Sequence, residues 1–147
     1  MAARPGIPLD TTSVSTVVIA GEQLLLVRDP AGFWTHLVTR VEADEVASTA
    51  ARRSVASQGL LDVALYAAEY LEQYFDLASE RIVLCPAFVA LVSAPPPTGV
   101  GRWCSLAESL ELAPFPNQHA LYRHVFDHFV TASPPTWLRV RPTGEKP

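Results

Sequence analysis

A short polar segment in the first half of the chain carries side chains whose types and spacing bear on metal binding and ion pairing. Ser54, Ser57 and Gln58 are spaced i, i+3 and i+4, so a helix places them on one face. Glu45 and Arg53 belong to the same segment and can form a charge-assisted pair. Two hydroxyls and an amide supply no negative charge, so this face offers little to a hard metal cation, which prefers carboxylate oxygens.

The element that must position these side chains is a helix from Glu45 to Gln58. Asp44 can cap its first turn, and Glu45 favours the positive end of the helix dipole. Gly59 is suited to end the helix, because glycine readily adopts the left-handed conformation that follows many helices. The apolar residues recur at helical spacing and form one stripe: Ala47, Ala50, Ala51 and Val55.

The segments before this helix have β character. Ser13–Ala20 is rich in β-branched residues and is followed by a Gly–Glu pair and by Gln23–Arg28, which predicts a hairpin. The next four residues, Asp29–Gly32, predict a turn. Phe33–Val41 then predicts a short extended piece that leads into the helix.

The segments after this helix complete an α/β pattern. Leu61–Phe75 predicts two short strands or one bent ribbon, with a helix over Val63–Gln73 as the alternative. Ile82–Val92 is the strongest candidate for a buried strand. Three later elements are predicted: a short strand or turn from Trp103, a short helix over Leu106–Leu112, and a helix over Gln118–Val130 that Pro116–Asn117 begins. The inner side of that last helix carries Leu121, Val125, Phe126 and Phe129.

From Phe33 to Gly59 the chain reads FWTHLVTRVEADEVASTAARRSVASQG. This resembles the box of the Nudix (MutT-like) superfamily, in which Gly, five residues, Glu and seven residues precede Arg-Glu-apolar-x-Glu-Glu. The matching positions are Phe33–Trp34, Val41–Glu42, Glu45, Ala50–Ala51, Arg53 and Val55. Trp103 and the helix start Pro116–Asn117–Gln118 are similar to the dihydroneopterin-triphosphate pyrophosphatase type. The resemblance implies an α/β Nudix fold, a mixed β-sheet sandwiched between α-helices.

The chain departs from this box where the family performs its chemistry. Thr39 stands at the box glycine, and Ser54 replaces the Glu that follows the arginine. Ser57 and Gln58 replace the final pair of Glu residues. In the family this helix face holds Mg²⁺, which activates water and clamps a diphosphate. Neutral side chains leave both metal recruitment and water activation without support, so we expect no Mg²⁺ cofactor.

The family's additional base is also missing from its expected place. It is often a Glu shortly before the later tryptophan, and residues 98–102 contain no carboxylate. We therefore expect that the usual hydrolysis is lost. Glu42, Glu45 and Arg53, with the replaced positions, remain as a vestigial box.

The resemblance also points to a ligand site around the FW-containing strand. The expected ligand-binding residues are Arg28, Phe33, Trp34, His36 and Glu45. Structural roles compete with binding at several of these positions. A loop or edge-strand role is favoured for His36, Trp34 can cover the core, and a structural Arg53–Glu45 pair is favoured over a ligand contact.

Histidine and cysteine residues give weaker signals. His124 and His128 have a spacing that can bind metal on a helix, but Val125 stands where a zinc protease carries Glu, and no third ligand is evident. A solvated helix face is therefore favoured. Cys85 and Cys104 lie in apolar stretches without metal-ligand spacing, which predicts two buried, reduced thiols.

The composition limits the classes of protein and partner. With 147 residues, 49% hydrophobic and 18% charged, the chain is typical of one globular domain. The net charge is −4 and the sequence has no basic run, so it lacks the positive surface with which proteins bind duplex nucleic acid or an anionic membrane. No apolar signal-peptide core follows Met1, so we expect a cytoplasmic protein. We expect one domain over 1–147, with its core at about 13–130 and loose termini at 1–12 and 131–147.

Three functions are compatible with these features. The preferred one is a non-hydrolytic module that binds a nucleoside-phosphate-like molecule or a related metabolite. The second is a protein-interaction domain that contacts its partner through the aromatic stretch Tyr66–Phe75 and the C-terminal tail from Thr131, and the aromatic stretch also predicts a homodimer. The third is a divergent Nudix pyrophosphohydrolase with replacement metal ligands drawn from Glu42, Asp44, Glu45, Glu69 and Glu72.

Overall fold

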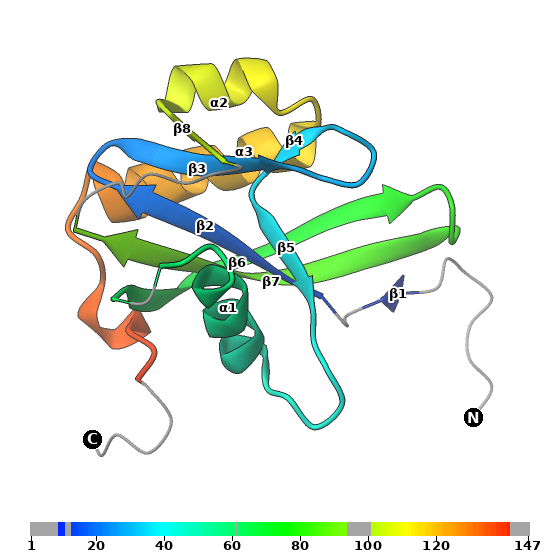
Figure 1. Ribbon diagram of the computed structural model, residues 1–147, viewed down its shortest axis with the longest axis horizontal. Helices are drawn as coiled ribbons and strands as arrows, with labels where there is room; N and C mark the ends of the chain where they lie inside the picture. Colours follow the sequence, from blue (N-terminus) through cyan, green and yellow to red (C-terminus); the bar gives the residue numbers. More distant parts are fainter. Residues whose placement is uncertain (1–8, 11–12, 61, 94–100, 142–147) are drawn as a thin grey trace.

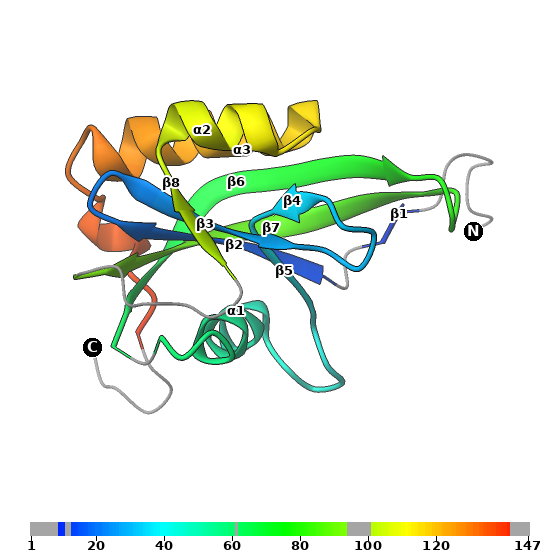
Figure 2. The same cartoon turned by 45° about the horizontal axis from the view of Figure 1, so that its top comes forward.

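The computed structural model describes residues 9–10, 13–60, 62–93 and 101–141. In this part of the chain a mixed β-sheet lies between helices (Figure 1). Helix α1 covers one face of the sheet, and helices α2 and α3 lie over the other face (Figure 2). The predicted α/β architecture is therefore confirmed.

The strands are β1 Leu9–Asp10, β2 Ser13–Ala20, β3 Gln23–Arg28, β4 Trp34–Thr35, β5 Leu37–Arg40, β6 Ala64–Asp76, β7 Arg81–Val92 and β8 Arg102–Cys104. The helices are α1 Ala47–Ala56, α2 Leu106–Leu112, α3 Pro116–Val125, the π-helix η1 Phe126–Val130 and the 3₁₀-helix η2 Thr136–Leu138.

Strand β2 lies at the centre of the sheet. It runs parallel to β7 over Ser15–Ala20. Its other edge has two antiparallel partners, β3 beside Ile19–Ala20 and β5 beside Ser13–Thr16. Strand β6 pairs with β7, and β8 pairs with β3, both antiparallel. Because β3 and β5 use different halves of β2, the connection through β4 and His36 must bridge them, and a cavity opens beside this connection.

The alternation of side chains along β2 divides the core into two apolar clusters. Val14 and Val18 pack with α1, whereas Val17 and Ile19 pack with α3 and η1. Ser15 lies on the same face as Val17, so a hydroxyl is directed into the α3 side of the core. Both helix stripes are buried as predicted: Ala50, Ala51 and Val55 on one side, and Leu121, Val125, Phe126 and Phe129 on the other.

The start of α1 differs from the prediction. The helix begins at Ala47, its N-cap is Val46, and no side chain caps it. The predicted Asp44 cap is wrong, because Asp44 occupies the preceding turn with a left-handed φ of 63°. Glu45 lies outside the helix, and its carboxylate is held by Arg53. The helix ends at Ala56, two residues before the predicted end at Gln58, and the turn that follows contains Gly59 with a φ of 81°, whose N–H is donated to the Ala56 carbonyl at 2.9 Å.

The aromatic segment after α1 is one long, irregular strand, as the bent-ribbon alternative predicted, and the helical alternative over Val63–Gln73 is wrong. Ala67 pairs with Phe88 and Leu71 pairs with Pro86, so β6 gains two residues relative to β7 between these pairs. Glu69 takes up the irregularity with a φ of 51°. This arrangement places Glu72 beside the start of α3.

The other predicted elements are present. The hairpin, the extended segment after the turn, the buried strand β7, the short strand at Trp103 and the helix over Leu106–Leu112 are all confirmed. The predicted last helix begins two residues early, at Pro116, and its final five residues are π-helical. Cys85 and Cys104 are buried and reduced, as predicted.

Parts of both termini that were predicted to be loose are in fact paired with the sheet. Strand β1 runs parallel to the start of β7. Near the other end, Val140 donates its N–H to the Leu65 carbonyl at 2.8 Å and accepts a hydrogen bond from Arg52 at 2.7 Å. Within the described ranges, no helix has both the length and the apolar character needed to cross a membrane.

Candidate functional site

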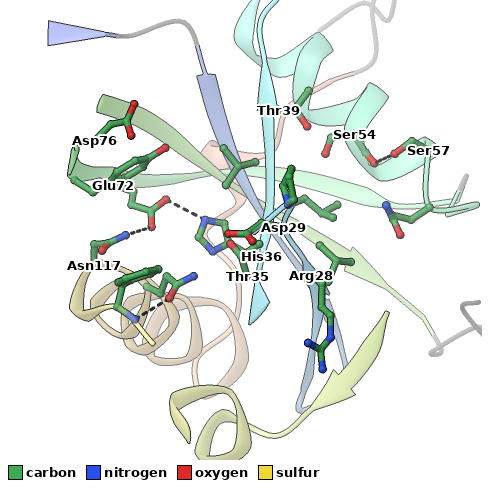
Figure 3. Close-up of a pocket in the computed structure, with 18 of the residues that line it drawn as sticks. Arg28, Asp29, Thr35, His36, Thr39, Ser54, Ser57, Glu72, Asp76 and Asn117 are labelled. Atoms are coloured by element: carbon green, nitrogen blue, oxygen red, sulfur yellow. Dashed lines mark hydrogen bonds and ion pairs between the residues drawn. The ribbon is translucent and has the colours of Figure 1, made fainter. Parts of the chain in front are cut away.

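A cavity of about 780 Å³ opens beside the β4–β5 connection. Its walls come from the β3–β4 turn, β5, the last turn of α1, the end of β6 and the start of α3 (Figure 3). The polar side chains among the described lining residues are Arg28, Asp29, Thr35, His36, Thr39, Ser54, Ser57, Gln58, Glu72, Tyr74, Asp76, Asn117 and Gln118. A cavity of this size and mixed lining is typical of small-molecule sites.

The wall contributed by α1 holds the three positions at which the box departs from the family pattern. Ser54, Ser57 and Gln58 all line the cavity. Ser54 is buried, and Ser57 Oγ donates a 2.6 Å hydrogen bond to the Ser54 carbonyl. In the described part of the chain, no three His, Cys, Asp or Glu side chains cluster closely enough to hold a metal ion. This donor set does not fit Mg²⁺, which requires anionic oxygen ligands.

Glu45 and Arg53 form a bidentate pair next to this wall but do not line the cavity. Arg53 donates through Nε and Nη2 to the two Glu45 oxygens at 3.0 and 2.9 Å, and through Nη2 to the Arg40 carbonyl. Glu45 also accepts the Glu42 N–H at 3.0 Å. The Arg53 hydrogen bonds, followed by that of Glu42, lower the pKa of Glu45 to about 2. The structural pair that the sequence favoured is therefore present.

A buried His–Glu pair lies at the opposite wall. His36 follows β4 and is 1% exposed, and Glu72 of β6 is 2% exposed. His36 Nε2 lies 3.0 Å from Glu72 Oε1, which also accepts the Ser15 hydroxyl at 2.6 Å. Glu72 Oε2 accepts a 2.9 Å hydrogen bond from Asn117 Nδ2 (Figure 3). One carboxylate thus joins β2, β6, the β4–β5 connection and α3.

Hydrogen bonding keeps Glu72 ionised despite its burial. Burial by itself raises the pKa of Glu72, but the charge of His36 and hydrogen bonds from His36, Ser15 and Asn117 together lower that pKa below its ordinary value. This hydrogen-bonded carboxylate is a fixed negative charge in the cavity wall.

Tyr122 fixes the other side of the histidine ring. Its hydroxyl oxygen accepts the His36 backbone N–H at 3.0 Å and lies 2.9 Å from His36 Nδ1. That hydroxyl can donate to Nδ1 of a neutral ring or accept from a protonated one, so Nε2–H faces Glu72 in both states. Burial raises the pKa of Tyr122, which keeps the phenol protonated. His36 lies in the connection between β4 and β5, as the loop alternative predicted, but it is buried and both of its ring nitrogens are engaged.

The start of α3 supplies the remaining polar contacts. Gln118 donates to the Trp34 carbonyl at 3.1 Å and accepts the Phe115 N–H at 2.9 Å, which ties β4 to the helix. Asn117 contacts Glu72 and lines the cavity. The sequence predicted this helix start but gave Asn117 no role. Glu72 was predicted only as a possible replacement metal ligand, because its strand also carries Glu69, Gln73 and Asp76 and gives no signal that singles Glu72 out.

The structure brings only part of the predicted ligand set to the cavity. Arg28 and His36 line it, whereas Phe33, Trp34 and Glu45 do not. The Arg28 guanidinium lies 4.6 Å from the centre of the Trp34 ring and donates to the Gly32 carbonyl. Trp34 packs against the α3-side core, so it covers the core as its alternative role predicted. Phe33 is half exposed and makes an edge contact with Phe115.

Two further sequence features lie away from the cavity. His124 Nε2 lies 2.7 Å from the Ala68 carbonyl, and its ring stacks on His128, so the predicted solvated face is wrong for His124. Residues 98–100, where the additional base would be expected, lie outside the described residues. Arg102 of the same stretch pairs with Glu108 at 3.2 Å.

Comparison by sequence gives no relative: no protein-family model matches the chain, and no curated protein shows significant similarity to it. Comparison by structure finds several similar folds. The dihydroneopterin triphosphate pyrophosphohydrolase of E. coli superimposes with a TM-score of 0.70 and 14% identity, covering 86% of this chain and 99% of the enzyme. The Ap4A hydrolase of C. elegans gives 0.65 and 18%, covering 83% and 98%.

A third similar structure is the NUDIX domain of NrtR from Shewanella oneidensis, solved in complex with ADP ribose. Its TM-score is 0.62 at 15% identity, with 84% of this chain and 89% of that chain covered. The three structures share the sheet and helices of this chain at identities too low to transfer an activity. The resemblance first indicated by the box residues is thus borne out at the level of tertiary structure, and the chain has the Nudix fold.

Proposed function

We propose that this chain binds a nucleoside-phosphate-like molecule or a related metabolite in its cavity and does not hydrolyse it by a metal-dependent route. The observation that carries the proposal is the α1 wall, where Ser54, Ser57 and Gln58 line a cavity of about 780 Å³. The space for a ligand is kept, while the side chains that face it lack the charge needed to recruit Mg²⁺.

The nearby carboxylates support this proposal because they are already engaged. Glu45 is occupied by Arg53, and Glu42 lies 3.8 Å from the same guanidinium. Glu72 accepts hydrogen bonds from three side chains. The remaining replacement ligands of the divergent-hydrolase alternative, Asp44 and Glu69, lie outside the cavity lining.

The structural neighbours support the class of ligand. One of them was solved with ADP ribose bound, and two others are described as hydrolases of dihydroneopterin triphosphate and Ap4A. A Nudix fold that keeps the cavity and loses the metal-binding carboxylates is suited to hold such a molecule without cleaving it.

A thermal-shift screen of the full chain tests binding. Nucleosides, nucleotides and ADP-ribose are added with and without Mg²⁺, and at least one compound is expected to raise Tm equally in both conditions. Ser57→Trp, which fills the cavity from an exposed helix position, should abolish the shift. Ala56→Trp is the matched control, because Ala56 is exposed on the same helix but does not line the cavity.

A parallel assay tests the chemistry. Release of phosphate or nucleoside monophosphate from nucleoside triphosphates, ADP-ribose and dinucleoside polyphosphates should remain at background with Mg²⁺. Robust Mg²⁺-dependent turnover that disappears in Glu45→Gln would reject the proposal and favour the divergent hydrolase.

A further inference from the structure

The cavity has a negative charge balance. Among the described lining residues, three carboxylates, Asp29, Glu72 and Asp76, stand against one arginine, Arg28. Protonation of His36 adds one positive charge at most, so the balance stays negative in both of its states. The whole chain has a net charge of −4, which adds a field of the same sign.

Two of the three carboxylates, Asp29 and Asp76, are held in place by hydrogen bonds within their own turns. Asp29 Oδ1 accepts the Phe33 N–H at 2.9 Å. Asp76 accepts the Ala78 N–H at 3.4 Å and the Ser79 hydroxyl at 2.6 Å. Figure 3 shows Asp29 and Asp76 on different elements around the pocket. Their charges are therefore fixed parts of the lining rather than side chains free to turn away.

The positive groups offer a polyanion little compensation. Arg28 donates to a backbone carbonyl and lies over Trp34. Arg53 is committed to Glu45, and Arg81, although opposite Asp76 in the β6–β7 ladder, does not line the cavity. A nucleoside triphosphate would bring further negative charges into a lining that already carries three carboxylates, so charge repulsion opposes its binding.

The remaining lining suits a planar ring that carries N–H donors. Asn117 donates through Nδ2 to Glu72, which leaves its carbonyl oxygen to accept from a ligand. Glu72 Oε2 accepts only that one hydrogen bond among the described residues, and a carboxylate oxygen can accept a second. Phe75 and Phe115, each about half exposed, add aromatic surface to the same lining.

We propose that this cavity selects an uncharged or cationic nucleoside-like molecule without phosphate, whose N–H donors face Glu72 and Asn117. The inference rests on the proposed binding function but keeps only its second ligand class, the related metabolites, and excludes the phosphorylated molecules.

Calorimetric titration of the full chain with matched pairs tests the selectivity. Adenosine, guanosine, cytidine and uridine are each compared with their own 5′-triphosphate in EDTA. At least one nucleoside should bind, and should bind about tenfold more tightly than its triphosphate, because charge repulsion acts on the triphosphate alone. Raising the ionic strength from ~0.05 to ~0.3 M should strengthen triphosphate binding, the opposite of a cationic site.

Variants of Asp29 and Asp76 separate the effect of charge on binding from the effect of cavity shape. The double variant Asp29→Asn, Asp76→Asn removes two charges with little change in shape, because each new amide keeps an oxygen that can accept the backbone N–H. It should bind the triphosphate about threefold to tenfold more tightly and so reduce the preference for the nucleoside over its triphosphate. Glu22→Gln, an exposed carboxylate outside the cavity lining, is the control and should change neither.

The outcomes are distinguishable. A triphosphate that binds as tightly as its nucleoside, or that weakens with added salt, overturns the inference and leaves the proposed binding function intact. If none of the eight compounds in the matched pairs binds and none of the wider screen raises Tm, the proposed function fails and the inference fails with it.

Discussion

Glu72 Oε1 lies 3.0 Å from His36 Nε2, although the two residues are 36 positions apart in the sequence and their side chains are only 1% exposed. The pair joins the long strand β6 to the connection between β4 and β5. Ser15 and Asn117 add hydrogen bonds from β2 and α3. The geometry of the cavity wall therefore depends on a single ionised carboxylate in the interior.

Glu72→Gln is expected to destabilise the fold by about 2–4 kcal/mol, because removing the charge from a buried pair leaves its partners incompletely satisfied. The amide can replace some hydrogen bonds, but its NH₂ group would face a donor from Asn117 or His36. Urea unfolding at pH 7 measures the loss. Glu22→Gln, at an exposed turn, should change the free energy of unfolding by less than about 0.5 kcal/mol. Equal stabilities of Glu72→Gln and wild type would contradict a structural role for this network.

The same carboxylate should contribute to acid sensitivity. The folded-state pKa of Glu72 lies below its ordinary value of 4.5, so the folded protein favours the ionised form. This contribution is fully present above pH 4.5 and is lost as the pH falls through the lowered pKa. Tm measured between pH 6 and pH 3, at constant ionic strength, should therefore fall less steeply in Glu72→Gln than in wild type. A steeper fall in the variant would contradict a lowered pKa of Glu72 in the folded protein.

Arg53 should control the titration of Glu45. The hydrogen bonds from Arg53 are the main reason that the pKa of Glu45 falls to about 2. Arg53→Lys cannot form the bidentate pair, so the Glu45 pKa should rise toward its ordinary value of 4.5. Side-chain carboxyl NMR shifts followed against pH give this value. Arg52→Lys, on the same helix, is the control, because Arg52 contacts Val140 instead.

Restoring the box carboxylates should restore a response to Mg²⁺. In the triple variant Ser54→Glu, Ser57→Glu, Gln58→Glu, three carboxylates would face one wall of the cavity, where their mutual repulsion is relieved by the ion. Mg²⁺ at about ten times its Kd should then raise Tm by roughly 3 °C. The wild type should show no such shift, since its neutral side chains gain little from a hard cation.

A neutral variant of similar size serves as the control for this experiment. Ser54→Gln, Ser57→Gln adds the same bulk at the buried position 54 and at position 57 without charge. It shares any loss of packing with the carboxylate variant but should not respond to Mg²⁺ at constant ionic strength. Equal shifts in the two variants would mean that the three positions do not form a metal-facing surface.

A homodimer remains a prediction from the aromatic stretch of β6. Leu71 and Phe75 of this strand are each about half exposed, and Leu77 just after it is 81% exposed. Sedimentation velocity at tens of micromolar should show about twice the 16.0 kDa chain mass. Leu71→Asp, on the exposed apolar surface and outside the cavity lining, should shift the protein toward monomer. A wild-type monomer under these conditions would reject the prediction.

Local patterns determined most of the elements. The alanine stripe of α1 and the inner face of the last helix are properties of 3.6-residue periodicity, and they are buried as predicted. The pairing of Arg53 with Glu45 could also be predicted from the sequence, because the two residues lie eight positions apart in one loop and helix. The Asp44 cap failed because Asp44 lies in the turn before α1 with a left-handed φ of 63°, so the N-cap position falls to Val46.

The tertiary structure decided the cavity and the state of its groups. Four residues that are distant in sequence meet at the cavity wall: His36, Glu72, Asn117 and Tyr122. They meet only because β5 pairs with β2, β6 pairs with β7, and α3 packs over β6. The irregularity at Glu69 lengthens β6 relative to β7, and no spacing rule in the sequence reports it. Sequence periodicity is set by contacts a few residues apart, whereas the burial and charge balance of this site come from long-range pairing.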